Sequence, residues 1–150
     1  MIYWFTGQPG AGKTSIAKSL IEKLPTNTFH VDGDDLREIF NNKDYSESGR
    51  RKNIELAQHI SHFLHNKGNN VLVSLVSPYR DQREDFKNTL KGSIIEIYVH
   101  TDHIRGREDF HVKNYEEPID NFLDMDTSDV LIETCVNQIL EYEKLYRESR

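Results

Sequence analysis

Gly7-Gln8-Pro9-Gly10-Ala11-Gly12-Lys13-Thr14 is the stretch that decides the fold of this 150-residue chain. It matches the pattern G-x-x-x-x-G-K-[ST], in which backbone N–H groups of a glycine-rich loop surround phosphate oxygens at the start of a helix. The apolar run Ile2-Tyr3-Trp4-Phe5 precedes it and is typical of a strand, which is the context that the pattern requires. The stretch therefore predicts a phosphate-binding loop between a strand and a helix. The alternative is a glycine-rich turn that only resembles such a loop.

The loop predicts where a nucleoside triphosphate binds. Lys13 is expected to reach the β- and γ-phosphates of ATP, and the Thr14 hydroxyl is expected to help hold Mg²⁺. The predicted ATP-binding residues are Gly7, Gln8, Pro9, Gly10, Ala11, Gly12, Lys13, Thr14 and Ser15.

The bulk composition is that of a globular protein, with 36% hydrophobic and 29% charged residues. We expect a single domain over residues 1–150. The net charge of −6 argues against nonspecific nucleic-acid binding, which needs a cationic surface. No run approaches the ~20 apolar residues that span a bilayer, and we see no leader peptide. Cys135 is the only cysteine and cannot form an internal disulfide, so a cytoplasmic location is expected.

Strand signals and helix signals alternate along the chain. The expected strands are 2–6, 28–32, 71–76, 94–99 and 122–125, and the expected helices are 13–24, 34–40, 50–67, 78–90 and 130–146. This alternation predicts an α/β protein with a mostly parallel central sheet of about five strands and helices on both faces. With the phosphate loop, this is the three-layer fold of P-loop NTPases and kinases.

The charged segment 102–120 is long for a connection without regular structure. In a phosphotransfer enzyme such a segment serves as a lid, because closing it excludes water from the γ-phosphate. We therefore predict a short lid here; the alternative is a loosely ordered surface loop.

Asp32-Gly33-Asp34-Asp35 follows the second expected strand. Ligands of open parallel sheets lie beyond the carboxyl ends of the strands, so these carboxylates should share a rim with the phosphate loop. A carboxylate there can accept a proton from a substrate hydroxyl or help hold the metal. Asp34 or Asp35 can instead cap the following helix, a role that fits Asp32 less well because it still lies on the strand.

Two cationic runs stand out in this acidic chain, Arg50-Arg51-Lys52-Asn53 and Ser77-Pro78-Tyr79-Arg80-Asp81-Gln82-Arg83. Arginine binds phosphate or sulfate with two parallel hydrogen bonds, so together the runs indicate an anionic substrate. Solvated helix faces are the alternative explanation for each run alone.

The order GQPGAGKT, VDGDDLR, YSESGRRKN, SPYRDQR and YEEP resembles the adenylyl-sulfate kinase family over residues 2–127. That family reads a phosphate loop, D-G-D-x-x-R, F-S-x-x-x-R-x-x-N, S-P-Y-R-x-x-R and a lid ending in Y-E-x-P. The resemblance implies transfer of the γ-phosphate of MgATP to the 3′-hydroxyl of adenosine 5′-phosphosulfate, and with it a role in sulfate activation and assimilation. It is also compatible with a homodimer.

The resemblance also implies roles for individual residues. Asp32 and Lys13 are the implied catalytic residues, and Thr14 and Asp32 are the implied metal-binding residues. Tyr45 stands where the family places a phenylalanine against adenine, and tyrosine can stack equally well. The implied substrate-binding residues, with Lys113 added for its chemistry alone, are Asp34, Arg37, Tyr45, Arg50, Asn53, Val76, Ser77, Arg80 and Lys113.

The expected lid departs from the family pattern, which carries D-P-K-G-L-Y-K-x-A and F-T-G stretches before Y-E-x-P. Here only residues 105–114 precede Tyr115-Glu116-Glu117-Pro118. Two alternatives therefore stay open: a P-loop kinase that acts on another nucleotide or small hydroxyl substrate, and a non-catalytic nucleotide-binding module.

Overall fold

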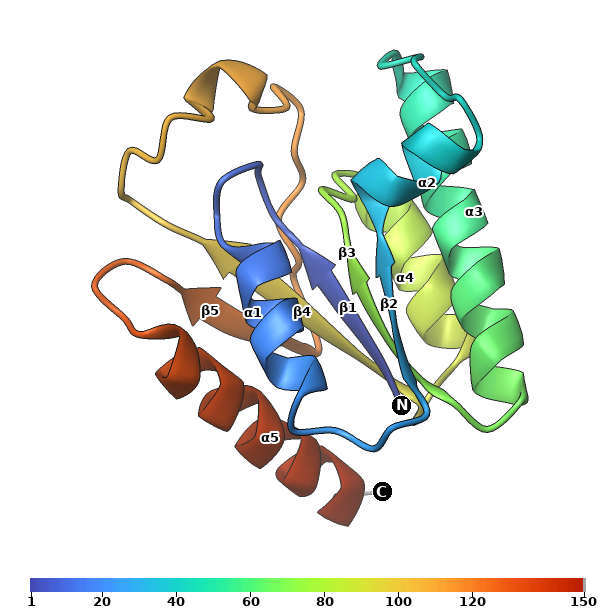
Figure 1. The fold of residues 1–150 in the computed structure, drawn as a ribbon, viewed down its shortest axis with the longest axis vertical. Helices are drawn as coiled ribbons and strands as arrows, with labels where there is room; N and C mark the ends of the chain where they lie inside the picture. The colour runs from blue at the N-terminus through green and yellow to red at the C-terminus, as the bar shows by residue number, and fades with distance from the viewer. Residues whose placement is uncertain (150) are drawn as a thin grey trace.

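Five parallel strands form the centre of the computed structural model, which describes residues 1–149 (Figure 1). Their spatial order is β2-β3-β1-β4-β5, so β1, which leads into the phosphate loop, lies in the middle of the sheet. Every strand pair is parallel, and all carboxyl ends therefore meet at one edge. The strands are β1 (Ile2–Thr6), β2 (Thr28–Asp32), β3 (Asn70–Ser74), β4 (Ile94–His100) and β5 (Phe122–Asp126).

Helices cover both faces of the sheet, as Figure 1 shows, with α1 and α5 on one side and α3 and α4 on the other. The short helix α2 follows β2, and the 3-10 turn η1 lies in the segment between β4 and β5. The helical elements are α1 (Lys13–Ile21), α2 (Gly33–Ile39), α3 (Glu47–Asn66), α4 (Arg80–Thr89), η1 (Glu108–Phe110) and α5 (Ile132–Glu148).

Alternation along β1 divides the core into two parts. Tyr3 and Phe5 pack with the side chains of α1 and α5, whereas Ile2 and Trp4 pack with those of α3 and α4. Because a central strand is covered on both faces, its sequence is a continuous apolar run rather than an alternating one. This core holds the carboxyl edge of the sheet rigid and so positions the loops that follow the strands.

The predicted fold class, an α/β sheet of five strands between two helical layers, is confirmed. Several predicted boundaries were wrong by a few residues. Helix α3 begins at Glu47 rather than at residue 50, because the Ser46 hydroxyl accepts a hydrogen bond from the Gly49 N–H at 3.3 Å and caps it. Strand β3 ends at Ser74 rather than at residue 76, because the chain turns away toward Ser77, where φ is 46°.

Predicted helix ends also differ by a few residues from those in the structure. Helix α1 ends at Ile21 rather than at residue 24, and α4 begins at Arg80 rather than at residue 78. Helix α5 begins at Ile132 and continues to Glu148. None of the helices within residues 1–149 is long and apolar enough to cross a membrane.

Candidate active site

A cleft of about 890 Å³ opens at the carboxyl edge of the sheet. Its walls come from the phosphate loop, the turn after β2, the start of α3, residues 74–78 and the segment after β4, and its volume suits a small-molecule ligand. The predicted site residues that line it are Pro9, Gly10, Gly12, Lys13, Thr14, Ser15, Asp32, Asp34, Arg37, Tyr45, Arg50, Asn53, Val76 and Ser77. Gly7, Gln8, Ala11, Arg80 and Lys113 lie outside this lining.

The phosphate loop begins at a position that only glycine can occupy. A Cβ atom on Gly7 would lie 2.1 Å from the carbonyl oxygen of Val99 on β4, well inside van der Waals contact. The Gly7 N–H donates to the Val76 carbonyl at 3.2 Å, which ties the loop to the chain after β3. At its other end, Gly12 has a φ of 111° and precedes the first turn of α1.

Lys13 is buried at the base of the loop, with 7% of its surface exposed. Its Nζ donates to the carbonyl oxygens of Gly7 at 2.6 Å and Gln8 at 2.9 Å. Burial and, as the smaller cause, the nearby positive charge of Arg107 lower the pKa of Lys13 to about 8, whereas Asp34 and Asp32 act in the opposite direction. An anionic ligand in the cleft would favour the charged ammonium.

Asp32 is the N-cap of α2, which corrects the expectation that Asp34 or Asp35 would take this role. Its Oδ2 accepts from the N–H groups of Asp34 at 3.1 Å and Asp35 at 3.4 Å. Its Oδ1 accepts from the hydroxyls of Thr14 at 3.3 Å and Ser74 at 2.9 Å. One carboxylate therefore joins the phosphate loop, β3 and α2, and its orientation is set from three directions.

The Ser74 hydroxyl extends this arrangement to His30. The hydroxyl donates its proton to Asp32, so its contact with His30 Nε2 at 2.7 Å requires the imidazole to be the donor. Burial lowers the pKa of His30, which favours the neutral ring. The sequence analysis did not select Ser74; a polar residue between the apolar Val73 and Leu75 was the available signal.

Arg37 and Tyr45 lie together on the side of the cleft that the resemblance assigns to the substrate. The Arg37 guanidinium lies 4.1 Å from the Tyr45 ring centroid and donates to the carbonyls of Asn42 and Asp44, both at 3.1 Å. Tyr45 is 62% exposed. Arg37 thus shapes the turn that carries this aromatic ring.

Of the two cationic runs, only Arg50 brings a cationic side chain to the cleft wall. Within residues 1–149, no hydrogen bond or ion pair of the structure involves its guanidinium. Arg51 instead pairs with Glu47 and Asp81, both at 2.9 Å. Arg83 is buried and pairs with Glu96, so the expectation that both runs form the anion pocket is wrong in this respect.

Two other predicted substrate-binding residues, Asn53 and Arg80, make hydrogen bonds to backbone carbonyls of the protein. The Asn53 amide donates to the Gly33 carbonyl at 3.3 Å, and its buried Oδ1 has no hydrogen-bond partner in the described structure. The Arg80 guanidinium donates twice to the Glu117 carbonyl, at 2.9 and 2.7 Å, which holds it away from the cleft. Lys113 is exposed.

The segment between β4 and β5, which contains the predicted lid, is docked on the phosphate loop. Val112 exchanges two hydrogen bonds of 2.8 Å with the Gln8 amide, one as donor and one as acceptor. Arg105 donates to the carbonyls of Ala11 at 3.3 Å and Thr127 at 3.0 Å. Arg105 and Arg107 both line the cleft, and neither was selected from the sequence.

Comparison with known proteins identifies the family and the fold. The sequence profile described as Adenylylsulphate kinase matches residues 1–119. The adenylyl-sulfate kinase of Oceanobacillus iheyensis is 31% identical over 166 aligned positions, which cover 95% of this chain and 83% of that protein. The adenylyl-sulfate kinase of Staphylococcus carnosus is 29% identical over 168 positions, with the same two coverages. Both alignments are longer than this chain, so both relatives have residues that it lacks.

Solved structures share the fold. The Mycobacterium tuberculosis APS kinase CysC in complex with AMPPNP and APS superposes with a TM-score of 0.79 and 24% identity, over 93% of this chain and 95% of that one. A gluconokinase from Sinorhizobium meliloti has a TM-score of 0.68 at 15% identity, over 98% and 93% of the two chains. These likenesses concern the P-loop kinase fold. The sequence matches go further, and because they span most of the chain, it belongs to the adenylylsulphate kinase family.

Proposed function

We propose that this chain is an adenylyl-sulfate kinase, which transfers the γ-phosphate of ATP to the 3′-hydroxyl of adenosine 5′-phosphosulfate. One observation carries the proposal: Lys13 of the phosphate loop and Asp32 after β2 line the same cleft as Tyr45 and Arg50. A nucleotide-binding module needs only the phosphate loop, whereas a kinase needs groups for the phosphate donor and groups for the acceptor in the same cleft. Membership of the family supports the same reaction.

The residues divide the chemistry between donor and acceptor. Phosphoryl transfer depends on in-line positioning and on neutralising the charge of the migrating group. Lys13 supplies positive charge on the donor side, with Arg105 and Arg107 on the same wall. Asp32, fixed by its bonds to Ser74 and to the start of α2, orients the acceptor hydroxyl and takes its proton.

Mg²⁺ fits the oxygen ligands at this point. The Thr14 hydroxyl and the Asp32 carboxylate lie 3.3 Å apart on the cleft wall, and Mg²⁺ is commonly held by one or two carboxylates together with substrate phosphates. Thr14 and Asp32 would hold the ion, which supplies charge neutralisation at the phosphates when bound.

The acceptor is tested by direct comparison. Purified protein with MgATP should release ADP and form the 3′-phosphorylated product with adenosine 5′-phosphosulfate, and should do so far more slowly with AMP, adenosine and gluconate. The relatives have residues that this chain lacks, and its lid is short, so another nucleotide or a small alcohol is the competing acceptor. Preference for one of those acceptors would overturn the assignment while leaving a kinase. Tight MgATP binding with no phosphorylated acceptor would favour a binding module.

We propose a homodimer in the cytoplasm as the working form of the enzyme. The APS kinase of Thiobacillus denitrificans is described as hexameric, so a protein of this fold can associate with copies of itself. Light scattering across a concentration series would measure the mass, and a monomer at micromolar concentration would contradict the dimer.

Replacing Gln8 by leucine should uncouple ATP consumption from transfer. The change removes the two hydrogen bonds that hold Val112, each of which contributes about 1 kcal/mol, so the equilibrium between the docked and the undocked lid should shift about 30-fold toward the undocked state. Water would then reach the γ-phosphate. The ratio of ATP hydrolysed to product formed should rise, as measured by parallel assays of ADP and product. Leucine at the exposed Gln138 is the matched control, and an unchanged ratio in Gln8→Leu would show that the clamp does not exclude water.

Replacing Gly49 by alanine should weaken acceptor binding selectively. A Cβ at residue 49 would lie 2.1 Å from the Asp44 carbonyl oxygen, so the turn that carries Tyr45 must move. A misplaced binding group reduces the benefit of positioning, and we expect KM for the acceptor to rise on the order of tenfold with little change in KM for ATP. The exposed neighbour Ser48→Ala is the control. Equal changes in both KM values would contradict a local effect.

A further inference from the structure

A buried ionic cluster lies between α4 and β4, behind the cleft. The side chains of Arg83 and Glu96 have no exposed surface, and Arg83 Nε donates to Glu96 Oε2 at 2.7 Å. Lys87 donates to the other carboxylate oxygen, also at 2.7 Å. Removing charges from water opposes folding, and an apolar set of similar volume often stabilises a core as well or better. The cluster therefore calls for an explanation other than stability.

The Arg83 guanidinium joins two parts of the site. One terminal nitrogen donates to the Ser77 carbonyl at 2.6 Å, and the other donates to the Glu116 carbonyl. Ser77 lines the cleft, and Glu116 belongs to residues 115–120, which we call the lid stem. A single side chain thus links Ser77, on the cleft wall, to the base of the lid.

Ser77 needs such support because its backbone is strained. Its φ of 46° lies in the left-handed region, which costs on the order of 1 kcal/mol or more for a non-glycine residue. Besides Arg83, the Thr6 hydroxyl contacts the Ser77 carbonyl at 3.0 Å, and the Trp4 indole N–H donates to the Ser77 hydroxyl at 3.2 Å. Strained conformations persist where the surroundings hold them from several sides.

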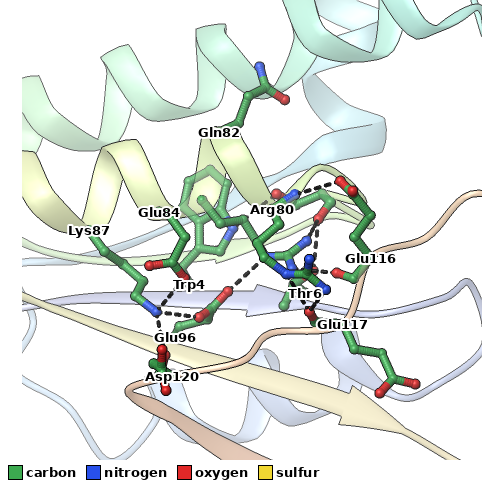
Figure 2. Close-up of polar contacts among 12 residues, drawn as sticks. Trp4, Thr6, Arg80, Gln82, Glu84, Lys87, Glu96, Glu116, Glu117 and Asp120 are labelled. Carbon is green, nitrogen blue, oxygen red and sulfur yellow. Dashed lines mark hydrogen bonds and ion pairs between the residues drawn. The ribbon is translucent and has the colours of Figure 1, made fainter.

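The lid stem is held in the same way by one face of α4. Arg80, Arg83 and Lys87 follow the i, i+3, i+7 spacing that places residues on one side of a helix. Their cationic groups donate to three stem carbonyls: those of Glu117, Glu116 and, at 2.8 Å from Lys87, Asp120. Figure 2 shows Arg80 and Lys87 reaching the stem from α4. The stem is therefore fixed to the core, and it gives the rest of the lid, residues 102–114, a fixed base.

We infer that Arg83 and Glu96 are positioning residues for the proposed transfer. Glu96 holds the Arg83 guanidinium in place, and the guanidinium fixes Ser77 against the acceptor while it anchors the stem from which the lid reaches the phosphate loop. Neither residue lines the cleft, so they act through Ser77 and Glu116 rather than on the substrate. The kinetic part of this inference rests on the proposed function.

The test compares Arg83→Lys with Arg83→Met and with Ile139→Ala. Lysine keeps a positive charge beside Glu96 but cannot reach two separate carbonyls at once. Ile139 is fully buried on the opposite face of the sheet, so its truncation lowers stability without touching the stem. Steady-state kinetics with both substrates, ADP binding by calorimetry and amide hydrogen exchange are measured on all three variants and on the unaltered chain.

Both Arg83 variants should show KM for the acceptor raised and kcat lowered, with a combined loss in kcat/KM of about 10–100-fold. Exchange at the backbone amides of 77, 79, 115–117 and 119–120 should accelerate, while ADP affinity stays within about twofold because the phosphate loop is not altered. Ile139→Ala should lose stability and keep its acceptor KM. If Arg83→Met does not fold, Arg83→Lys carries the test alone.

Two results would overturn the inference. The first is wild-type acceptor KM and wild-type stem exchange in Arg83→Lys. The second is an equal kinetic change in Ile139→Ala at matched loss of stability, which would make Arg83 only a fold-stabilising residue. If the unaltered chain does not phosphorylate adenosine 5′-phosphosulfate, the proposed function fails, yet the exchange and ADP measurements still decide whether Arg83 anchors Ser77 and the stem.

Discussion

Replacing Lys13 by methionine is expected to lower kcat by about 10²–10³-fold, the usual effect of removing one preorganised donor to a charged transition state. The ammonium group is buried at the base of the phosphate loop, where two backbone carbonyls hold it. A charge in such a place acts on the migrating phosphoryl group with little screening by water. The rate of product formation at saturating ATP and acceptor measures the loss.

Lys18→Met is the matched control, because it removes the same charge from an exposed position on the same helix. Its kcat should stay within about twofold of the original value. A Lys13→Met protein that retains full kcat and normal circular dichroism would remove Lys13 from the mechanism.

The same variant reports on the pH dependence of stability. Burial lowers the pKa of Lys13 from its ordinary 10.5 to about 8. Between these values the unfolded chain binds more protons at this residue than the folded chain, so the free energy of unfolding gains a contribution that rises with pH. Below about pH 8 the penalty of burying the charge is fully present. Urea unfolding of both proteins from pH 7 to 10.5, without nucleotide, should therefore show the advantage of Lys13→Met shrinking as pH rises. A difference that does not vary with pH would contradict the lowered pKa.

Local signals in the sequence were enough to predict most of the fold. The phosphate loop and the apolar runs predicted a parallel sheet between helices, because each depends on residues close in the chain. The strand order β2-β3-β1-β4-β5 was not predicted, since it depends on pairing between distant segments. Boundaries were wrong where one side chain decides them, as Ser46 does at the start of α3.

The site residues that could be predicted are likewise those that belong to local sequence motifs. Lys13, Asp32 and Arg50 line one cleft, as expected from motifs whose spacing is local. The cationic runs were less informative, because spacing alone does not distinguish an arginine that meets a substrate from one that holds a carbonyl. Arg83 is buried against Glu96, and Gln8, at a variable position of the loop pattern, holds the lid. Both contacts join segments that are far apart in the sequence.

Replacing Asp32 by asparagine is expected to lower kcat by about 10²–10⁴-fold with little loss of stability, because the change removes the base and keeps the shape. Asparagine caps helices about as well as aspartate, so an amide oxygen can still accept from the N–H groups of Asp34 and Asp35. The Ser74 hydroxyl then lies beside an amide group. This amide cannot take the proton from the hydroxyl of the acceptor substrate.

Asp35→Asn separates this effect from a general loss of negative charge. Asp35 lies in the first turn of α2, is exposed, and does not line the cleft. The two variants carry the same net charge, so nonspecific electrostatic effects on ATP binding are alike. Single-turnover transfer from ATP to adenosine 5′-phosphosulfate should be slow only in Asp32→Asn, while KM for ATP changes little in Asp35→Asn. A well-folded Asp32→Asn enzyme with an undiminished transfer rate would show that the acceptor hydroxyl loses its proton to another group, and would reduce Asp32 to the cap of α2.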